Sequence, residues 1–152
     1  MFPRRKNVIP RGEEGRAIRE RFNDESACKR CGKCCYQGFV VKGYFILMPD
    51  LPCRYLVSDG NGHMVCSEYE RRHEIEWCNP ANPKTARQGL FPPDCAYVQG
   101  IKNYHGKIPP PEGQKEKIRK ILYKRVKEMQ CPEHLKQEDW LRFLIRISKP
   151  VV

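Results

Sequence analysis

The sequence lacks several patterns that would place it quickly in a common class. No stretch approaches the ~18 consecutive apolar residues of a membrane-spanning helix, and no apolar run of signal-peptide length follows the charged start of the chain. The glycine-rich loops that bind phosphates and the Gly-x-Ser-x-Gly elbow are also missing, which argues against a nucleotide enzyme, a kinase or a hydrolase. We therefore expect a cytoplasmic chain with no membrane span and no independent catalytic activity.

Histidine is scarce and scattered through polar segments. The four histidines are His63, His73, His105 and His134. Each is expected to be solvated; His63 and His73, which stand a few residues from a cysteine, are the two to test as substitute metal ligands or proton carriers.

A large apolar core is not guaranteed by the composition. The chain has 152 residues with 13 prolines and 11 glycines, and most of these lie between residues 32 and 113. A loop-rich middle of this kind buries few side chains unless something else holds it together. We therefore expect a small, irregular, loop-rich α+β domain that is stabilised by metal and followed by a C-terminal helical hairpin.

Cysteine, in contrast, is abundant and clustered. Eight of the nine cysteines precede residue 96: Cys28, Cys31, Cys34, Cys35, Cys53, Cys66, Cys78 and Cys95. In a reducing compartment such a cluster indicates metal or redox chemistry, whereas in an exported chain it would indicate a disulfide framework. Because adjacent Cys34 and Cys35 are expected to point in different directions, each is predicted to serve a different centre.

The number of thiols limits which kinds of metal centre the chain could hold. One structural zinc needs four ligands, so eight thiols imply two four-ligand sites or one larger cluster. A Cys-x2-Cys-x2-Cys run followed by distant cysteines is how 4Fe-4S clusters are commonly held, although the ferredoxin loop ends differently. We predict all eight cysteines as ligands of one or two iron-sulfur clusters, most simply 4Fe-4S, with zinc as the alternative. The spacing does not assign sulfurs to centres.

The cysteine pattern resembles a known family. The segments that carry the resemblance are Cys28-x2-Cys31-x2-Cys34-Cys35, Pro52-Cys53-Arg54-Tyr55-Leu56, Cys66-Ser67-Glu68-Tyr69-Glu70-Arg71-Arg72, Trp77-Cys78 and Pro92-Pro93-Asp94-Cys95-Ala96-Tyr97. Over residues 28–98 they look like the CxxCxxCC family of zinc- or iron-chelating domains. The resemblance implies iron-sulfur binding or an oxidoreductase-like component, and a similar domain is carried by flagellin lysine N-methylases.

Three regions are predicted along the chain. Residues 1–27 form a basic arm with a short helix over 12–22, residues 28–111 form the eight-cysteine metal-binding domain, and residues 112–152 form a basic amphipathic helical hairpin. The apolar spacing predicts its helices over 112–129 and 133–147. Its aromatic and aliphatic surplus is expected to pack on the cysteine domain. Residues 108–113 are predicted to be a stiff connector, and Cys131 a buried or capping thiol.

Shorter elements are predicted around the cysteines. Residues 39–48 read as one bent strand or two short ones, interrupted at Gly43 and ended by Pro49. The Asp-Gly-Asn-Gly turn at 59–62 predicts a small hairpin with Cys53 and Cys66 at its two ends. Residues 67–76 are predicted to be a helical turn or two.

Positive charge is concentrated at the two ends of the chain, and the formal net charge is +11. Lys29, Arg30 and Lys33 are expected to balance the charge of the thiolates. The other basic residues predict an acidic partner, either an acidic protein face or, second, nucleic acid; they are Arg4, Arg5, Lys6, Arg11, Lys115, Lys117, Arg119, Lys120, Lys124, Arg125 and Lys127. The sequence thus predicts an electron-transfer, cluster-delivery or structural subunit of a larger redox or maturation complex. A structural zinc adaptor, a methyltransferase-associated cysteine domain and a nucleic-acid-binding accessory protein are the alternatives.

Overall fold

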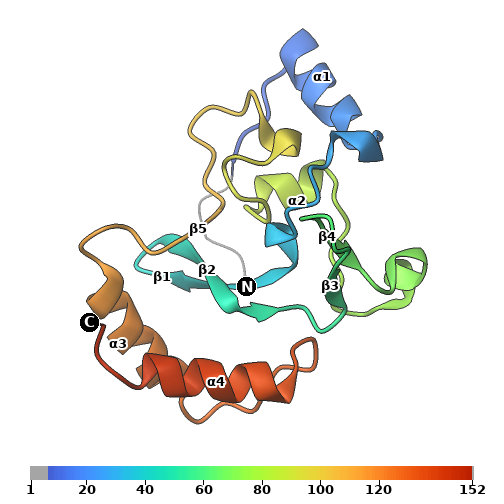
Figure 1. Cartoon of the computed structure of the whole chain (residues 1–152). Helices are drawn as coiled ribbons and strands as arrows, with labels where there is room; N and C mark the ends of the chain where they lie inside the picture. Colours follow the sequence, from blue (N-terminus) through green and yellow to red (C-terminus); the bar gives the residue numbers. More distant parts are fainter. Residues whose placement is uncertain (1–6, 152) are drawn as a thin grey trace.

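The computed structural model describes residues 7–151 and shows a small mixed α+β fold (Figure 1). Its helices are α1 (Glu13–Arg21), α2 (Pro83–Arg87), α3 (Lys115–Val126) and α4 (Gln137–Ile147), and its strands are β1 (Tyr36–Val41), β2 (Tyr44–Pro52), β3 (Leu56–Ser58), β4 (Met64–Cys66) and β5 (Lys107–Ile108). Short 3-10 turns cover Glu25–Ala27 (η1), Lys33–Cys35 (η2), Tyr69–Glu74 (η3) and Ala96–Val98 (η4). None of the helices in this part of the chain is long and apolar enough to cross a membrane.

The central sheet has the order β1-β2-β5. β1 and β2 are antiparallel and are joined by Lys42 and Gly43, whose φ angles of 53° and 82° suit a tight hairpin turn. The two predicted short strands are therefore confirmed, but the prediction that Pro49 ends the second one is wrong. The register shifts between Leu47 and Pro52 of β2, so the missing N–H of Pro49 breaks no bond of the ladder.

The C-terminal hairpin packs on this sheet. α3 buries Ile118, Leu122 and Val126 at four-residue steps, and α4 buries Trp140, Phe143 and Ile147. Together with the inner face of β1 and β2 they make one apolar cluster: Val41, Ile46, Met48, Leu51, Ile118, Leu122, Val126, Leu135, Trp140, Phe143 and Ile147. The predicted packing of the hairpin on the cysteine domain is confirmed, and the apolar core is larger than the composition suggested.

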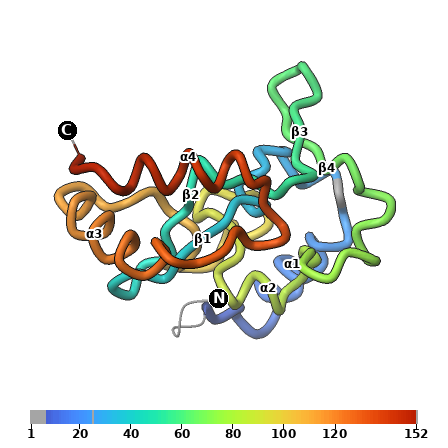
Figure 2. Tube along the Cα trace, turned by 90° about the horizontal axis from the view of Figure 1, so that it is seen from below, coloured from blue at the N-terminus to red at the C-terminus, as the bar shows by residue number. Residues whose placement is uncertain are grey.

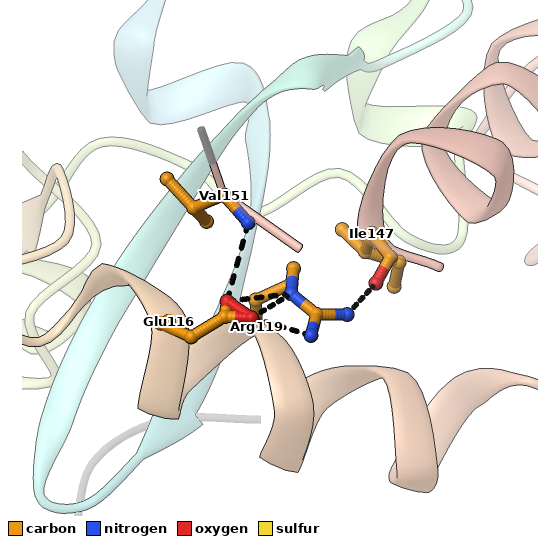
Figure 3. Close-up of polar contacts among 4 residues, drawn as sticks. All are labelled: Glu116, Arg119, Ile147 and Val151. Atoms are coloured by element: carbon orange, nitrogen blue, oxygen red, sulfur yellow. Dashed lines mark hydrogen bonds and ion pairs between the residues drawn. The ribbon is translucent and has the colours of Figure 1, made fainter. Parts of the chain in front are cut away.

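Polar contacts fix the hairpin to the rest of the fold. Arg125 donates to the carbonyl oxygen of Val40 at 2.7 Å, and Arg146 of α4 pairs with Asp50 of β2. Within the hairpin, Arg119 pairs with Glu116 and donates to the carbonyl oxygen of Ile147, while Glu116 accepts from the N–H of Val151 (Figure 3). The end of the chain is thereby held against α3.

A second apolar cluster lies on the opposite side of the sheet, where α1 and α2 appear in Figure 1. It contains Ile9, Ile18, Ala86, Leu90, Phe91, Tyr97, Val98, Ile101 and Tyr104. Phe22 stacks on Tyr97 with the ring centroids 4.9 Å apart, and Arg21 donates to the carbonyl oxygen of Ala96 at 2.8 Å. The predicted N-terminal helix is confirmed, and it belongs to this core; Arg4, Arg5 and Lys6 lie outside the described residues.

The predicted hairpin over residues 55–65 is confirmed as β3 and β4. The strands pair with Leu56 opposite Cys66 and Ser58 opposite Met64. Its turn projects away from the rest of the molecule (Figure 2). The hairpin therefore contributes its base, where Cys53 and Cys66 lie, rather than its tip, to the centre of the fold.

Candidate metal centre

The cysteine-rich run folds as a chain of tight turns. Arg30 and Gly32 adopt left-handed backbone conformations with φ of 54° and 77°, and η2 follows at Lys33–Cys35. Gly32 has no room for a side chain, because a Cβ there would lie 2.7 Å from Cβ of Met64. The N–H of Arg30 points to the sulfur of Cys28 at 3.3 Å. This is the arrangement that brings thiols at two-residue spacing to one side of a loop.

Four thiols form a first group beside the N-terminal apolar cluster. They are Cys28, Cys31, Cys34 and Cys95. Cys34 and Cys95 pack against that cluster, and Lys33 and Asp94, which precede them, form an ion pair at 3.7 Å. Burial, with smaller contributions from the sulfurs of Cys34, Cys31 and Cys28, raises the pKa of Cys95 to about 11. The four sulfurs are therefore electrostatic neighbours.

A second group contains Cys35, Cys53, Cys66 and Cys78. The N–H of Cys53 donates to the carbonyl oxygen of Cys35 at 2.9 Å, and the β3–β4 pairing brings Cys66 close to the segment that follows Cys53. The ring of Tyr55 stacks on Trp77, with centroids 5.9 Å apart, which places Cys78 beside Cys53. Burial raises the pKa of Cys78, and so do the sulfurs of Cys66 and Cys53.

The two groups meet at Cys34 and Cys35. The thiols of Cys34 and Cys35 interact with each other, which the prediction that their side chains point in different directions did not anticipate. The contact with Cys35 lowers the pKa of Cys34 to about 7, with a smaller contribution from the charge of Lys107. The same contact, together with burial, raises the pKa of Cys35. Pairwise electrostatic interactions thus connect the eight thiols, and one of them joins Cys78 of the second group to Cys34 of the first.

The cluster is not closed around a metal position in this structure. Within residues 7–151, no three His, Cys, Asp or Glu side chains stand close enough together to hold a metal ion. All nine cysteines are free thiols, including the eight predicted ligands. The eight thiols come from five separate segments of the chain.

Lys107 is the residue of this region that the sequence did not reveal. It lies in β5, is only 5% exposed, and its ammonium donates to the carbonyl oxygens of Cys34 at 2.8 Å and Tyr36 at 2.7 Å. Burial lowers its pKa to about 8, while the sulfurs of Cys34 and Cys35 act in the opposite direction. The sequence around Lys107 has no pattern that indicates burial of this lysine. Its position becomes apparent only from the pairing of β5 with β2.

Trp77 has a buried donor without a partner. Its indole Nε1 is the one buried side-chain nitrogen or oxygen in the described part of the chain that makes no hydrogen bond. The ring lies between Tyr55 and His134, 6.4 Å from the latter, and directly precedes Cys78. His134 from the loop between α3 and α4 also lies 2.6 Å from Gln37 through Nε2. The α3–α4 hairpin thus contacts, through His134, the residue that precedes Cys78 of the second cysteine group.

The predicted substitute ligands lie away from the sulfurs. His63 pairs with Asp59 at 3.4 Å at the turn of the β3–β4 hairpin, and His73 is exposed in η3. The thiol of Cys131 donates to the carbonyl oxygens of Pro132 and Leu135 and packs against the hairpin core. Cys131 is therefore partly buried in the loop between α3 and α4 and caps neither helix.

Basic side chains surround the site unevenly. Lys29 and Arg30 are exposed, and Lys33 is already paired with Asp94. Of the basic residues predicted for a partner, Arg119 and Arg125 are occupied within the fold. The exposed ones on or just after α3 are Lys115, Lys117, Lys120, Lys124 and Lys127.

One curated protein is similar over most of the chain. The uncharacterized protein MJ1479.1 of Methanocaldococcus jannaschii is 31% identical over 109 residues, which cover 68% of this chain and 77% of that protein. No family model and no solved structure matches.

Proposed function

The chain belongs to the same family as the Methanocaldococcus jannaschii protein MJ1479.1, and we propose that it binds metal through its two groups of four thiolates. Iron-sulfur clusters are the cofactor that we favour, and zinc is the alternative. Cys28, Cys31, Cys34 and Cys95 would hold one centre, and Cys35, Cys53, Cys66 and Cys78 the other. The proposal agrees with the resemblance to the CxxCxxCC family of zinc- or iron-chelating domains.

The observation that carries the proposal is that eight free thiols from five segments interact electrostatically with one another. Neighbouring sulfurs raise one another's pKa at Cys78 and Cys95, because bringing thiolates together in a partly buried site is electrostatically unfavourable. A bound cation removes this cost, since metal ions bind the deprotonated sulfur and release its proton. Metal uptake by these side chains would therefore stabilise the fold.

Two further groups fit an anionic sulfur centre. The unpartnered indole N–H of Trp77, next to Cys78, is a donor of the kind that hydrogen-bonds to cluster sulfurs. Lys107 supplies a buried positive charge next to the backbone of Cys34 and Cys35. When bound, an iron-sulfur centre supplies one-electron transfer; the protein holds the sulfurs, donates hydrogen bonds to them and sets their exposure.

We further propose that the chain works in the cytoplasm as an electron-transfer, cluster-delivery or structural subunit of a larger redox or maturation assembly. A reducing compartment keeps thiols free for metal. The exposed lysines of α3 suit a partner with an acidic face. Binding to RNA or DNA would instead be recognised by a steep loss of affinity with added salt.

The test is anaerobic purification followed by elemental analysis of iron, sulfide and zinc. Brown protein that contains iron and sulfide and bleaches with dithionite supports iron-sulfur binding. Colourless protein with two zinc ions per chain supports the zinc alternative. Metal-free protein that keeps nine reactive thiols, or that folds with disulfides, overturns the proposal.

A further inference from the structure

A buried lysine lies at the point where the two cysteine groups join. Lys107 reaches this point from β5, which pairs in parallel with β2 so that Lys107 stands opposite Phe45. Its ammonium donates to the carbonyl oxygens of Cys34 and Tyr36, the residues on either side of Cys35. One side chain therefore holds both ends of the Cys34–Tyr36 segment.

The charge of Lys107 has no carboxylate partner within residues 7–151, because none of the ion pairs there includes this lysine. The ring of Phe45 lies beside it, with the ring centroid 5.7 Å from Nζ. Phe45 fits there because Gly38 has no side chain, since a Cβ on Gly38 would lie 2.3 Å from the ring. A buried ammonium is costly unless an anion lies close to it.

Burial lowers the pKa of Lys107, and the sulfurs of Cys34 and Cys35 act in the opposite direction and raise it. They belong to different cysteine groups, and each becomes an anionic thiolate when it binds a metal. A metal held by four thiolates carries a charge of about -2, so two such centres would meet at this lysine. The ammonium can offset part of the negative charge of both.

We propose that Lys107 is a positioning residue for the metal centres: it pins the Cys34–Cys35 step that separates the two ligand sets, and its buried positive charge stabilises both sets of thiolates. This inference rests on the proposed metal binding. It goes further because it assigns to Lys107 the positive charge that would let two anionic metal centres lie side by side. It also gives β5, a strand of two residues, a function in the site.

The test compares apoprotein stability with metal affinity in variants of the full chain. Zinc is the probe, and its affinity is measured by competition with a chromophoric chelator under reducing conditions. Lys107→Met should weaken zinc binding about 10–100-fold, as is typical when a group supporting metal ligands is lost. The thermal midpoint of its apoprotein should change much less than the zinc affinity, because the loss of the two hydrogen bonds to Cys34 and Tyr36 is offset by the removal of a buried charge that has no carboxylate partner.

Two further variants make each result decisive. Lys107→Arg keeps the charge and the donors and should restore most of the affinity, whereas Lys102→Met, in the exposed loop before β5, should leave both properties unchanged. If Lys107→Met does not fold, Lys107→Gln replaces it with the same expectations. A parallel fall in stability and affinity would show a merely structural lysine and overturn the inference, as would unchanged affinity. Failure of the unmodified chain to bind zinc or iron would overturn the proposed function itself.

Discussion

The backbone N–H of Cys53 donates a hydrogen bond of 2.9 Å to the carbonyl oxygen of Cys35. These cysteines stand at the open end of the β1–β2 hairpin, whose closed end is the turn at Lys42 and Gly43. The same hairpin packs against α3 and α4 through Val41, Ile46, Met48 and Leu51. The β1–β2 hairpin therefore has two roles: it brings Cys35 and Cys53 together, and it forms one side of the main apolar core.

Serine substitutions should distinguish the predicted ligands from the ninth cysteine. Cys31→Ser removes one thiolate of the first group, so we expect the metal content to fall by about one centre per chain. Cys131→Ser is the matched control, because its thiol faces the carbonyl oxygens of Pro132 and Leu135. Elemental analysis of both variants checks the assignment; equal losses would contradict it.

The stability of the hairpin core should depend on Phe143. Its side chain is fully buried and lies parallel to Phe39, with centroids 6.2 Å apart. Phe143→Ala should lower the free energy of unfolding by about 3–5 kcal/mol. Leu141→Ala, on the same helix but 49% exposed, should change it by about 0.5 kcal/mol or less. Urea unfolding measures both, and similar losses would show that α4 is not packed as described.

Gly38 should tolerate no side chain while Phe45 keeps its ring. A Cβ at this position would lie 2.3 Å from the Phe45 ring, so Gly38→Ala should destabilise the fold by about 1–3 kcal/mol through overpacking. Combining it with Phe45→Leu should recover part of that loss relative to the sum of the two single changes. A double-mutant cycle by thermal or urea unfolding tests this, and strictly additive effects would exclude the contact.

The contact of Glu116 with Arg119 and Val151 (Figure 3) should make stability depend on pH. Hydrogen bonds from Arg119 lower the pKa of Glu116 from 4.5 to about 2. The carboxylate therefore contributes its full stabilisation above about pH 4.5, and this contribution is lost as the pH falls towards 2. Glu116→Gln should lower the thermal midpoint at neutral pH but not near pH 2. The exposed Glu128→Gln serves as the control, and a pH-independent difference would contradict the prediction.

The elements with local signals were predictable from the sequence. The Asp-Gly-Asn-Gly turn gave β3 and β4, and the spacing of Ile118, Leu122 and Val126 gave α3. α4 begins at Gln137 rather than near 133, because Pro132 and Leu135 form a turn before it. These elements were predictable because their signals depend on residues that are close together in the sequence.

The parts that depend on distant contacts were not predictable. β5 is two residues long and forms only by pairing with β2, so the segment before the connector gave no sign of a strand. The contact between the thiols of Cys34 and Cys35 depends on η2 and on Lys107. The packing of the hairpin on the cysteine segment was expected from its apolar surplus, but the residues of β1 and β2 that meet it in one core could not be read from the sequence.

The most direct test of metal binding by the eight thiols is native alkylation followed by mass spectrometry of the anaerobically purified chain. The account predicts that iodoacetamide modifies at most Cys131 before metal removal, because metal-bound thiolates are protected. After treatment with a strong chelator, eight further adducts should appear, at Cys28, Cys31, Cys34, Cys35, Cys53, Cys66, Cys78 and Cys95. Modification of these eight before chelation, or a pattern that the chelator leaves unchanged, would contradict the account.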